Sequence, residues 1–199
     1  MGGATCSASS TSGAGERIEL IRSVVSDRGG VHSGYKFCER GLTWIKPSFL
    51  WMMYRCGWAT KAGQETVLAV EITRDGFEWV LRNACLSSYV RGVHPDRATW
   101  QRQLKSVPTR IQWDPERDLH LQPLPYRSLQ LGLSGEAARR YADEWTVTIR
   151  DVTPLAHEIH TLVRSGNLDS AARLLPQERP YPAADELLPV ARPALAGVN

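Results

Sequence analysis

A polar stretch near the middle of the chain places two carboxylates and a basic side chain close together. Residues 110–118 read RIQWDPERD, with Asp114 and Glu116 ahead of Arg117. A carboxylate at the end of a strand can act as a general base or orient a ribose hydroxyl. Asp-Pro is also a common start of a turn, and ion pairs on an exposed turn are weak. The turn is the favoured interpretation, and Trp113 indicates a pocket beside it because an indole next to a polar turn needs cover.

Three basic residues, Lys46, Arg55 and Arg127, lie within apolar stretches. Burying such a charge is unfavourable unless it is paired. Each side chain must therefore reach the surface along its aliphatic stem or meet an acid or a phosphate. For Lys46 and Arg55, a bound ligand and an internal salt bridge both stay open. Ser48 fits a helix cap better than a nucleophile because no histidine lies near it in the sequence.

An aromatic block surrounds several of these residues. Residues 43–58 read TWIKPSFLWMMYRCGW and contain three Trp, one Tyr, one Phe and two Met. Such side chains are costly to leave in water, so the block is core, binding surface or both. The Lys-Pro step predicts an extended segment over residues 42–45, and Pro47 then suits the first position of a helix over residues 48–56. We expect the helix to be mostly core, with Lys46, Ser48 and Arg55 as the positions that could face a ligand.

The sequence His157-Glu158-Ile159-His160 resembles a metalloprotease motif with the wrong spacing. Zinc-binding histidines on one helix face are four residues apart, with a glutamate beside the first. Here they are three residues apart and no third ligand is evident. Surface histidines on an amphipathic helix are the favoured interpretation, and we assign no metal ligand.

Composition excludes several classes of protein. The 199 residues carry a net charge of +3, which permits nucleic-acid binding but does not argue for it. The four cysteines form no CxxC pair, so reduced thiols in a cytoplasmic protein are expected. No apolar run approaches the ~20 residues of a membrane span, so no membrane partner is expected.

The elements that would position these residues alternate irregularly between strand and helix. This pattern predicts an α+β fold, a single compact domain with a mixed, mainly antiparallel sheet and flanking helices. Strands are expected over residues 66–73, 109–113, 128–133 and 145–149, with a turn at 114–118 and a returning strand at 119–122. Helices are expected over residues 16–28, 77–86, 95–104, from 134, 151–165 and 168–175.

Four long motifs make the chain similar to a known family. They are TWIKPSFLWMMYRCGW (43–58), KAGQETVLAVEITRDGFEW (61–79), QWDPERDLHLQPLPYRSLQLGL (112–133) and DEWTVTIRDVT (143–153). From about residue 42 to residue 182 the chain resembles the domain of unknown function 4291 family, which has no established activity. The family is loosely similar to ADP-ribosyltransferases in size, in its α+β class and in a glutamate near a strand end, an analogy at the level of the fold.

Composition and the resemblance together predict four segments. Small polar residues predict a disordered tail at 1–15, and recurring prolines predict another at 177–199. The resemblance assigns 42–176 to the family domain and leaves 16–41 as an atypical N-terminal segment. Family members usually begin with a segment of the type VYQAY…IA…A, which residues 1–41 do not match. If the family's site uses that segment, this chain lacks part of it.

Two functions of different classes are expected from these residues. The first is a small transferase acting on a nucleotide-type substrate, with NAD as a candidate. Lys46 and Arg55 would hold phosphate, Trp51 or Trp113 would stack on a base, and Glu116 would orient the ribose or act as base. The alternative is a non-catalytic nucleic-acid or protein-binding module in which Trp44 and Trp58 stack on unpaired bases. A third reading treats the aromatic block as core alone.

The candidate residues follow from the first function. The candidate catalytic residues are Glu116 and Ser48, and the candidate substrate-binding residues are Trp44, Lys46, Trp51, Arg55, Gln112, Trp113 and Arg127. A concave site that gathers these side chains would favour an enzyme, and a scattered arrangement would not.

Overall fold

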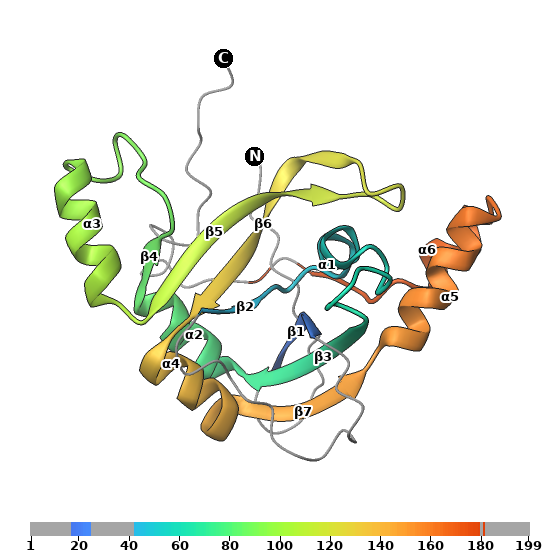
Figure 1. The fold of residues 1–199 in the computed structure, drawn as a ribbon, viewed down its shortest axis with the longest axis horizontal. Coiled ribbons are helices and arrows are strands. Elements are labelled where there is room, and N and C mark those ends of the chain that lie inside the picture. Colours follow the sequence, from blue (N-terminus) through green and yellow to red (C-terminus); the bar gives the residue numbers. More distant parts are fainter. Residues whose placement is uncertain (1–16, 25–41, 180, 182–199) are drawn as a thin grey trace.

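The architecture comes from a computed structural model that describes residues 17–24, 42–179 and 181. Its strands divide between two sheets, shown in Figure 1. An antiparallel three-stranded sheet has the order β1-β3-β7, formed by β1 (Arg17–Val24), β3 (Thr66–Thr73) and β7 (Thr146–Asp151). A four-stranded sheet has the order β2-β6-β5-β4, formed by β2 (Thr43–Ile45), β6 (Pro123–Leu133), β5 (Thr109–Arg117) and β4 (Ala84–Leu86). Only β4 and β5 pair in parallel among these, so the predicted α+β class with mainly antiparallel pairing is confirmed.

Six α-helices and one π-helical turn flank the sheets in the described chain. They are α1 (Phe49–Cys56), α2 (Arg74–Arg82), α3 (Arg97–Ser106), α4 (Gly135–Arg140), the π-turn η1 (Tyr141–Trp145), α5 (Thr153–Arg164) and α6 (Leu168–Leu174). Figure 1 shows α3 beside β4 at one end of the molecule and α5 and α6 at the other. Within the described residues, no helix combines the length and the apolar character needed to cross a membrane.

Strand β3 is buried on both faces and separates two hydrophobic cores. Leu68, Val70 and Ile72 face a core that joins both sheets with α2 and α4. Val67 and Ala69 face a second core that contains α1 and residues of α5 and α6. A strand that is buried on both faces has a nearly continuous apolar sequence. For this reason the sequence TVLAVEIT predicted β3 with its correct bounds.

Helix α1 has the expected signals at both ends. The Ser48 side chain accepts a hydrogen bond from the Trp51 backbone N–H and so caps the helix, while Gly57 ends it with φ +59°. Pro47 therefore lies just before the cap and not at the first helical position. The helix buries Phe49 and Met53 in the second core, as predicted.

The expected turn at residues 114–118 is wrong. Strand β5 continues to Arg117, and the hairpin turns at Asp118, whose backbone N–H donates to the Gln122 carbonyl. Pro115 has no backbone N–H to donate to the neighbouring strand. It is tolerated here because the pairing of β5 with β6 shifts register between Pro115 and Arg117, which forms a bulge. Consequently Asp114 and Glu116 are strand residues, and their side chains are held in fixed directions.

Two helix predictions are also wrong. The segment expected as a helix over residues 16–28 contains β1, which pairs with β3 along its whole length, so tertiary pairing overrides the helix-like spacing of its apolar residues. The helix expected over residues 77–86 is α2, which starts at Arg74 after the Thr73 cap and ends at Arg82. Residues 84–86 then form β4 against β5. The tail assigned to residues 1–15 and most of that assigned to 177–199 lie outside the described residues.

Candidate functional site

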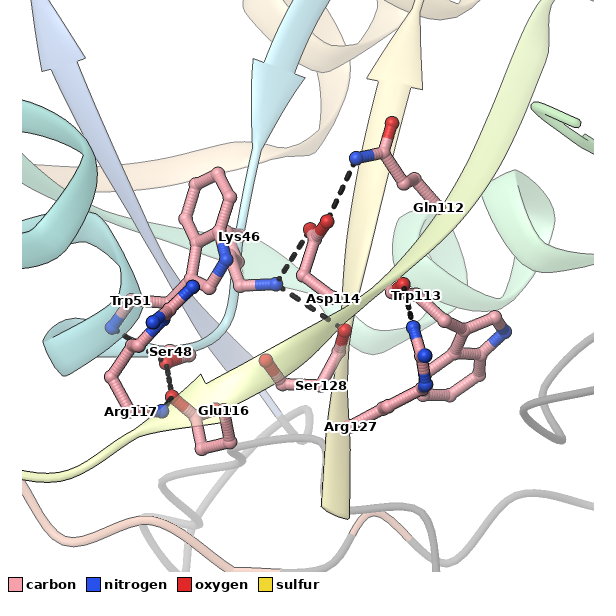
Figure 2. A network of polar contacts seen from close by, with 10 residues as sticks. All are labelled: Lys46, Ser48, Trp51, Gln112, Trp113, Asp114, Glu116, Arg117, Arg127 and Ser128. Atoms are coloured by element: carbon pink, nitrogen blue, oxygen red, sulfur yellow. Dashed lines mark hydrogen bonds and ion pairs between the residues drawn. The ribbon is translucent and has the colours of Figure 1, made fainter. Parts of the chain in front are cut away.

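One face of β5 carries a row of polar side chains. Gln112 and Asp114 lie two residues apart and share this face, and Gln112 Nε2 donates to Asp114 Oδ1 at 2.8 Å. Beyond the bulge, Glu116 reaches the segment between β2 and α1 and meets Ser48 there (Figure 2). The long strand, and not a flexible turn, therefore positions both carboxylates.

Lys46 directly follows β2 and is fully buried. Its Nζ donates to Asp114 Oδ2 at 3.2 Å and to the Ser128 carbonyl at 3.3 Å, and it lies 4.3 Å from the centre of the Trp51 ring (Figure 2). The internal salt bridge that the sequence allowed for Lys46 is present. The carboxylate and the indole face offset part of the cost of removing the ammonium from water.

Ser48 and Glu116 form the second half of the cluster. Ser48 Oγ donates to Glu116 Oε1 at 2.7 Å and at the same time accepts from the Trp51 N–H at 3.2 Å. Glu116 Oε1 also accepts from the Arg117 N–H at 2.8 Å, and the residue is 5% exposed. The helix cap thus also orients a buried carboxylate, which is a role that the sequence did not reveal.

Two residues that were not candidates border this cluster. The Phe49 N–H, at the start of α1, donates to Glu178 Oε1 at 3.0 Å. Burial raises the pKa of the half-exposed Tyr126, and the negative charges of Glu116 and Glu178 raise it further. Tyr126 lies within one of the family motifs, which was a usable signal, whereas Glu178 lies in a Pro-rich stretch that offered none.

The structure brings together Lys46, Ser48, Trp51, Gln112 and Glu116, and it adds Asp114 and Ser128. Ser128 pairs with Asp114 across the β5–β6 ladder, and its buried hydroxyl has no hydrogen-bond partner in the described part of the chain. The cluster therefore contains the Lys46–Asp114 ion pair and the buried Ser128 hydroxyl. This hydroxyl can donate and accept hydrogen bonds, and a substrate group could bind to it.

Other candidates lie outside the cluster. Trp113 faces the first core, and its carbonyl accepts from Arg127 Nη1 at 3.0 Å (Figure 2). Arg127 and Arg55 are exposed, and Arg55 bonds to none of the described site residues. Trp44 borders the cluster on the side of Lys46 and covers Gly132, where an added Cβ would lie 3.0 Å from its ring.

The two histidines of the metalloprotease-like motif, His157 and His160, lie on α5. Within the described residues, no group of three or more His, Cys, Asp and Glu side chains is placed to hold a metal ion. The His160 ring instead stacks on Trp58, with ring centres 5.3 Å apart and planes at 2°. Burial lowers the pKa of His160, and nearby Arg164 and His157 add to this. His160 is therefore a packing residue between α5 and the turn after α1.

Comparison with known families places the chain. The model of a domain of unknown function, DUF4291, matches residues 22–181, and the chain belongs to this family. The match begins before the expected residue 42, so it includes the end of β1. No curated protein and no solved structure matches the chain.

Proposed function

We propose that the protein is a small transferase that acts on a nucleotide-type substrate, with NAD as the first candidate. The observation that carries the proposal is the buried carboxylate of Glu116, oriented by Ser48 Oγ at 2.7 Å beside the Lys46–Asp114 ion pair. A fixed carboxylate can accept a hydrogen bond from a ribose hydroxyl, stabilise positive charge that develops on the sugar, or take a proton from an attacking group.

The arrangement of charges supports a site organised in advance of binding. Lys46 neutralises Asp114, so Glu116 is the carboxylate left to meet positive charge on a substrate. Lys46 thereby acts as a positioning residue and not as the phosphate ligand first expected. Arg117 is the cation next to Glu116 in sequence; its guanidinium lies 3.7 Å from the centre of the exposed Tyr54 ring, and we assign it the phosphate contact.

A loose likeness to ADP-ribosyltransferases adds weaker support. It rests on the α+β class, the size of the domain and a glutamate near the end of β5. An analogy at the level of the fold favours a transferase reaction but does not identify a substrate.

A cytoplasmic location belongs to the same proposal. Cys56 and Cys85 are free thiols in the core. Burial raises the pKa of both thiols, which keeps them protonated and unreactive, as suits a reducing compartment.

The test pairs ligand binding with turnover on the full chain. NAD and ADP-ribose should raise the Tm of the wild-type protein, and nicotinamide release should be detectable by chromatography. Glu116→Gln keeps the shape of the side chain and should lower turnover at least 100-fold. Glu158→Gln, at an exposed position on α5, is the matched control and should leave turnover unchanged. No thermal shift with either ligand and no NAD consumption, or a Glu116→Gln variant as active as wild type, would overturn the proposal.

The alternative function is a nucleic-acid or protein-binding module in which Trp44 and Trp58 stack on unpaired bases. The positions of these two rings do not support it. Trp58 is 4% exposed and is stacked on His160. Trp44 covers Gly132. Trp58 would have to leave His160 to stack on a base, whereas Trp44 is partly exposed.

A further inference from the structure

The positive charge of the chain is concentrated around α3. Residues 91–106 contain Arg91, Arg97, Arg102 and Lys105 against a single acid, Asp96, so this segment has the same net charge of +3 as the entire chain. We call it the basic lobe. The rest of the protein is neutral overall, which makes the lobe the place where long-range attraction of an anion would act.

Helix α3 presents these cations to solvent in one arc. At 100° per residue, Arg97, Lys105 and Arg102 fall within about 140° of the helix circumference. They span eight residues, which is about 12 Å of helix. All three are exposed, and no residue of α3 is buried. The helix therefore contributes little to the core, and its exposed face is available to a partner.

The opposite side of α3 holds the helix to the body of the protein. Trp100 Nε1 donates to the Leu86 carbonyl at 2.9 Å, and the ring packs near Tyr89 and His94. The cations are thus mounted on an anchored helix and not on a loose loop. A surface with fixed charges loses less conformational entropy when it binds a charged partner.

These cations are not neutralised within the protein. Among the described residues, none of Arg91, Arg97, Arg102 and Lys105 forms an ion pair. Asp96, the one acid, caps α3 by accepting from the Thr99 N–H at 2.7 Å and from its hydroxyl at 2.8 Å. The carboxylate makes these bonds within its own helix and forms no ion pair with the four cations, so the lobe keeps its net charge of +3.

We propose that the basic lobe binds the phosphodiester backbone of a nucleic acid without reading its sequence. Arginine forks match phosphate oxygens, and three cations over about 12 Å can contact two or three successive phosphates. A membrane surface fits less well, because Val93 is the one large apolar side chain exposed in the lobe and an interfacial helix needs an apolar face. The inference stands apart from the proposed transferase activity and uses different residues.

The test is fluorescence anisotropy with the full chain, a labelled oligo-dT strand and a labelled hairpin duplex. The wild-type protein should bind at low salt, with log Kd rising with log salt at a slope of about 1.5 to 2 for the single strand, as expected for two or three phosphate contacts. The two probes show whether a flexible strand or a duplex is preferred. Either preference supports the proposal.

Charge reversal localises the surface. Arg97→Glu, Arg102→Glu and Lys105→Glu together should weaken binding at least tenfold and flatten the salt slope. The matched control reverses Lys61, Arg164 and Arg173, which are exposed elsewhere, and changes the net charge equally. Circular dichroism and Tm check that both variants fold, and the milder Arg102→Gln/Lys105→Gln pair replaces the triple variant if it does not.

Three results would overturn the proposal. The first is no binding by the wild-type protein at 20 mM salt. The second is an equal loss of binding in the control and the lobe variant. The third is binding of poly-glutamate as tight as that of either nucleic acid, which would assign the lobe to acidic proteins instead.

Discussion

The buried ammonium of Lys46 is stabilised by the carboxylate of Asp114. Its ammonium is fully buried, 3.2 Å from Asp114 Oδ2, and the aspartate is itself held by Gln112. A buried pair of this kind contributes little net stability compared with apolar residues, but breaking one partner leaves an uncompensated charge. The pair therefore acts mainly to fix where polar groups lie beside Glu116.

Asp114→Ala is expected to destabilise the protein by about 3–5 kcal/mol, because it removes the carboxylate that lies 3.2 Å from the buried Lys46 ammonium. The double variant Lys46→Met/Asp114→Leu should recover most of that loss. Urea unfolding of the single and double variants gives the coupling energy between the two side chains. Losses that simply add would contradict the dependence of one side chain on the other.

At the scale of elements, α5 meets the turn after α1 through the His160–Trp58 stack. Burial lowers the pKa of His160, so the unfolded chain binds a proton more readily than the folded protein. The stability linked to this residue is fully present above the unfolded pKa of about 6.5 and is lost as the pH falls toward the lower folded value.

His160→Phe keeps a ring against Trp58 and removes the titration. Between pH 7.5 and pH 5.5, the Tm of the wild-type protein should therefore fall further than the Tm of the variant. Calorimetry at the two pH values measures the difference, and subtraction of the two curves removes the carboxylates that both proteins share. The same pH dependence in both proteins would show that the stack tolerates a charged imidazole.

Local signals predicted some elements and misled on others. The N-terminal cap of α1 and the apolar run of β3 are encoded within a few residues, and each was predicted. The strand at β1 depends on a partner far away in sequence, and the extension of β5 through Pro115 depends on a bulge in its pairing with the neighbouring β6; both were missed. The site follows the same rule: Lys46, Ser48 and Glu116 were found by residue type, whereas the role of Glu178 depends on a contact with Phe49 that no local pattern encodes.

At the scale of the whole molecule, the segment after α6 joins separate parts of the fold. Glu178 accepts from the Phe49 N–H at the start of α1. Tyr181 donates to Glu78 Oε1 at 2.8 Å and accepts from Arg74 Nε at 3.1 Å, both on α2, and its ring lies 5.0 Å from that of Phe77. This segment therefore links the two helices that pack into the two different cores.

Glu178→Gln should destabilise the protein by about 0.5–1 kcal/mol, because it removes a negative charge from the positive end of α1. It should also lower the pKa of Tyr126, which Glu178 helps to raise. Absorbance at 295 nm across a pH titration reports the tyrosine, with Tyr126→Phe versions of both proteins to isolate its signal. An unchanged Tyr126 pKa in Glu178→Gln would contradict the prediction, because it would show that the Glu178 charge does not affect the phenol.

The bond from Phe49 to Glu178 joins residues 129 positions apart. At synthesis rates of about 5–20 residues per second, Glu178 is added roughly 6–26 s after Phe49. For that interval the start of α1 lacks its carboxylate acceptor, and Glu116 arrives at Ser48 only part-way through it. A nascent or prematurely ended chain therefore differs from a finished chain at the polar cluster. Chaperones and proteases could distinguish the two chains by this difference.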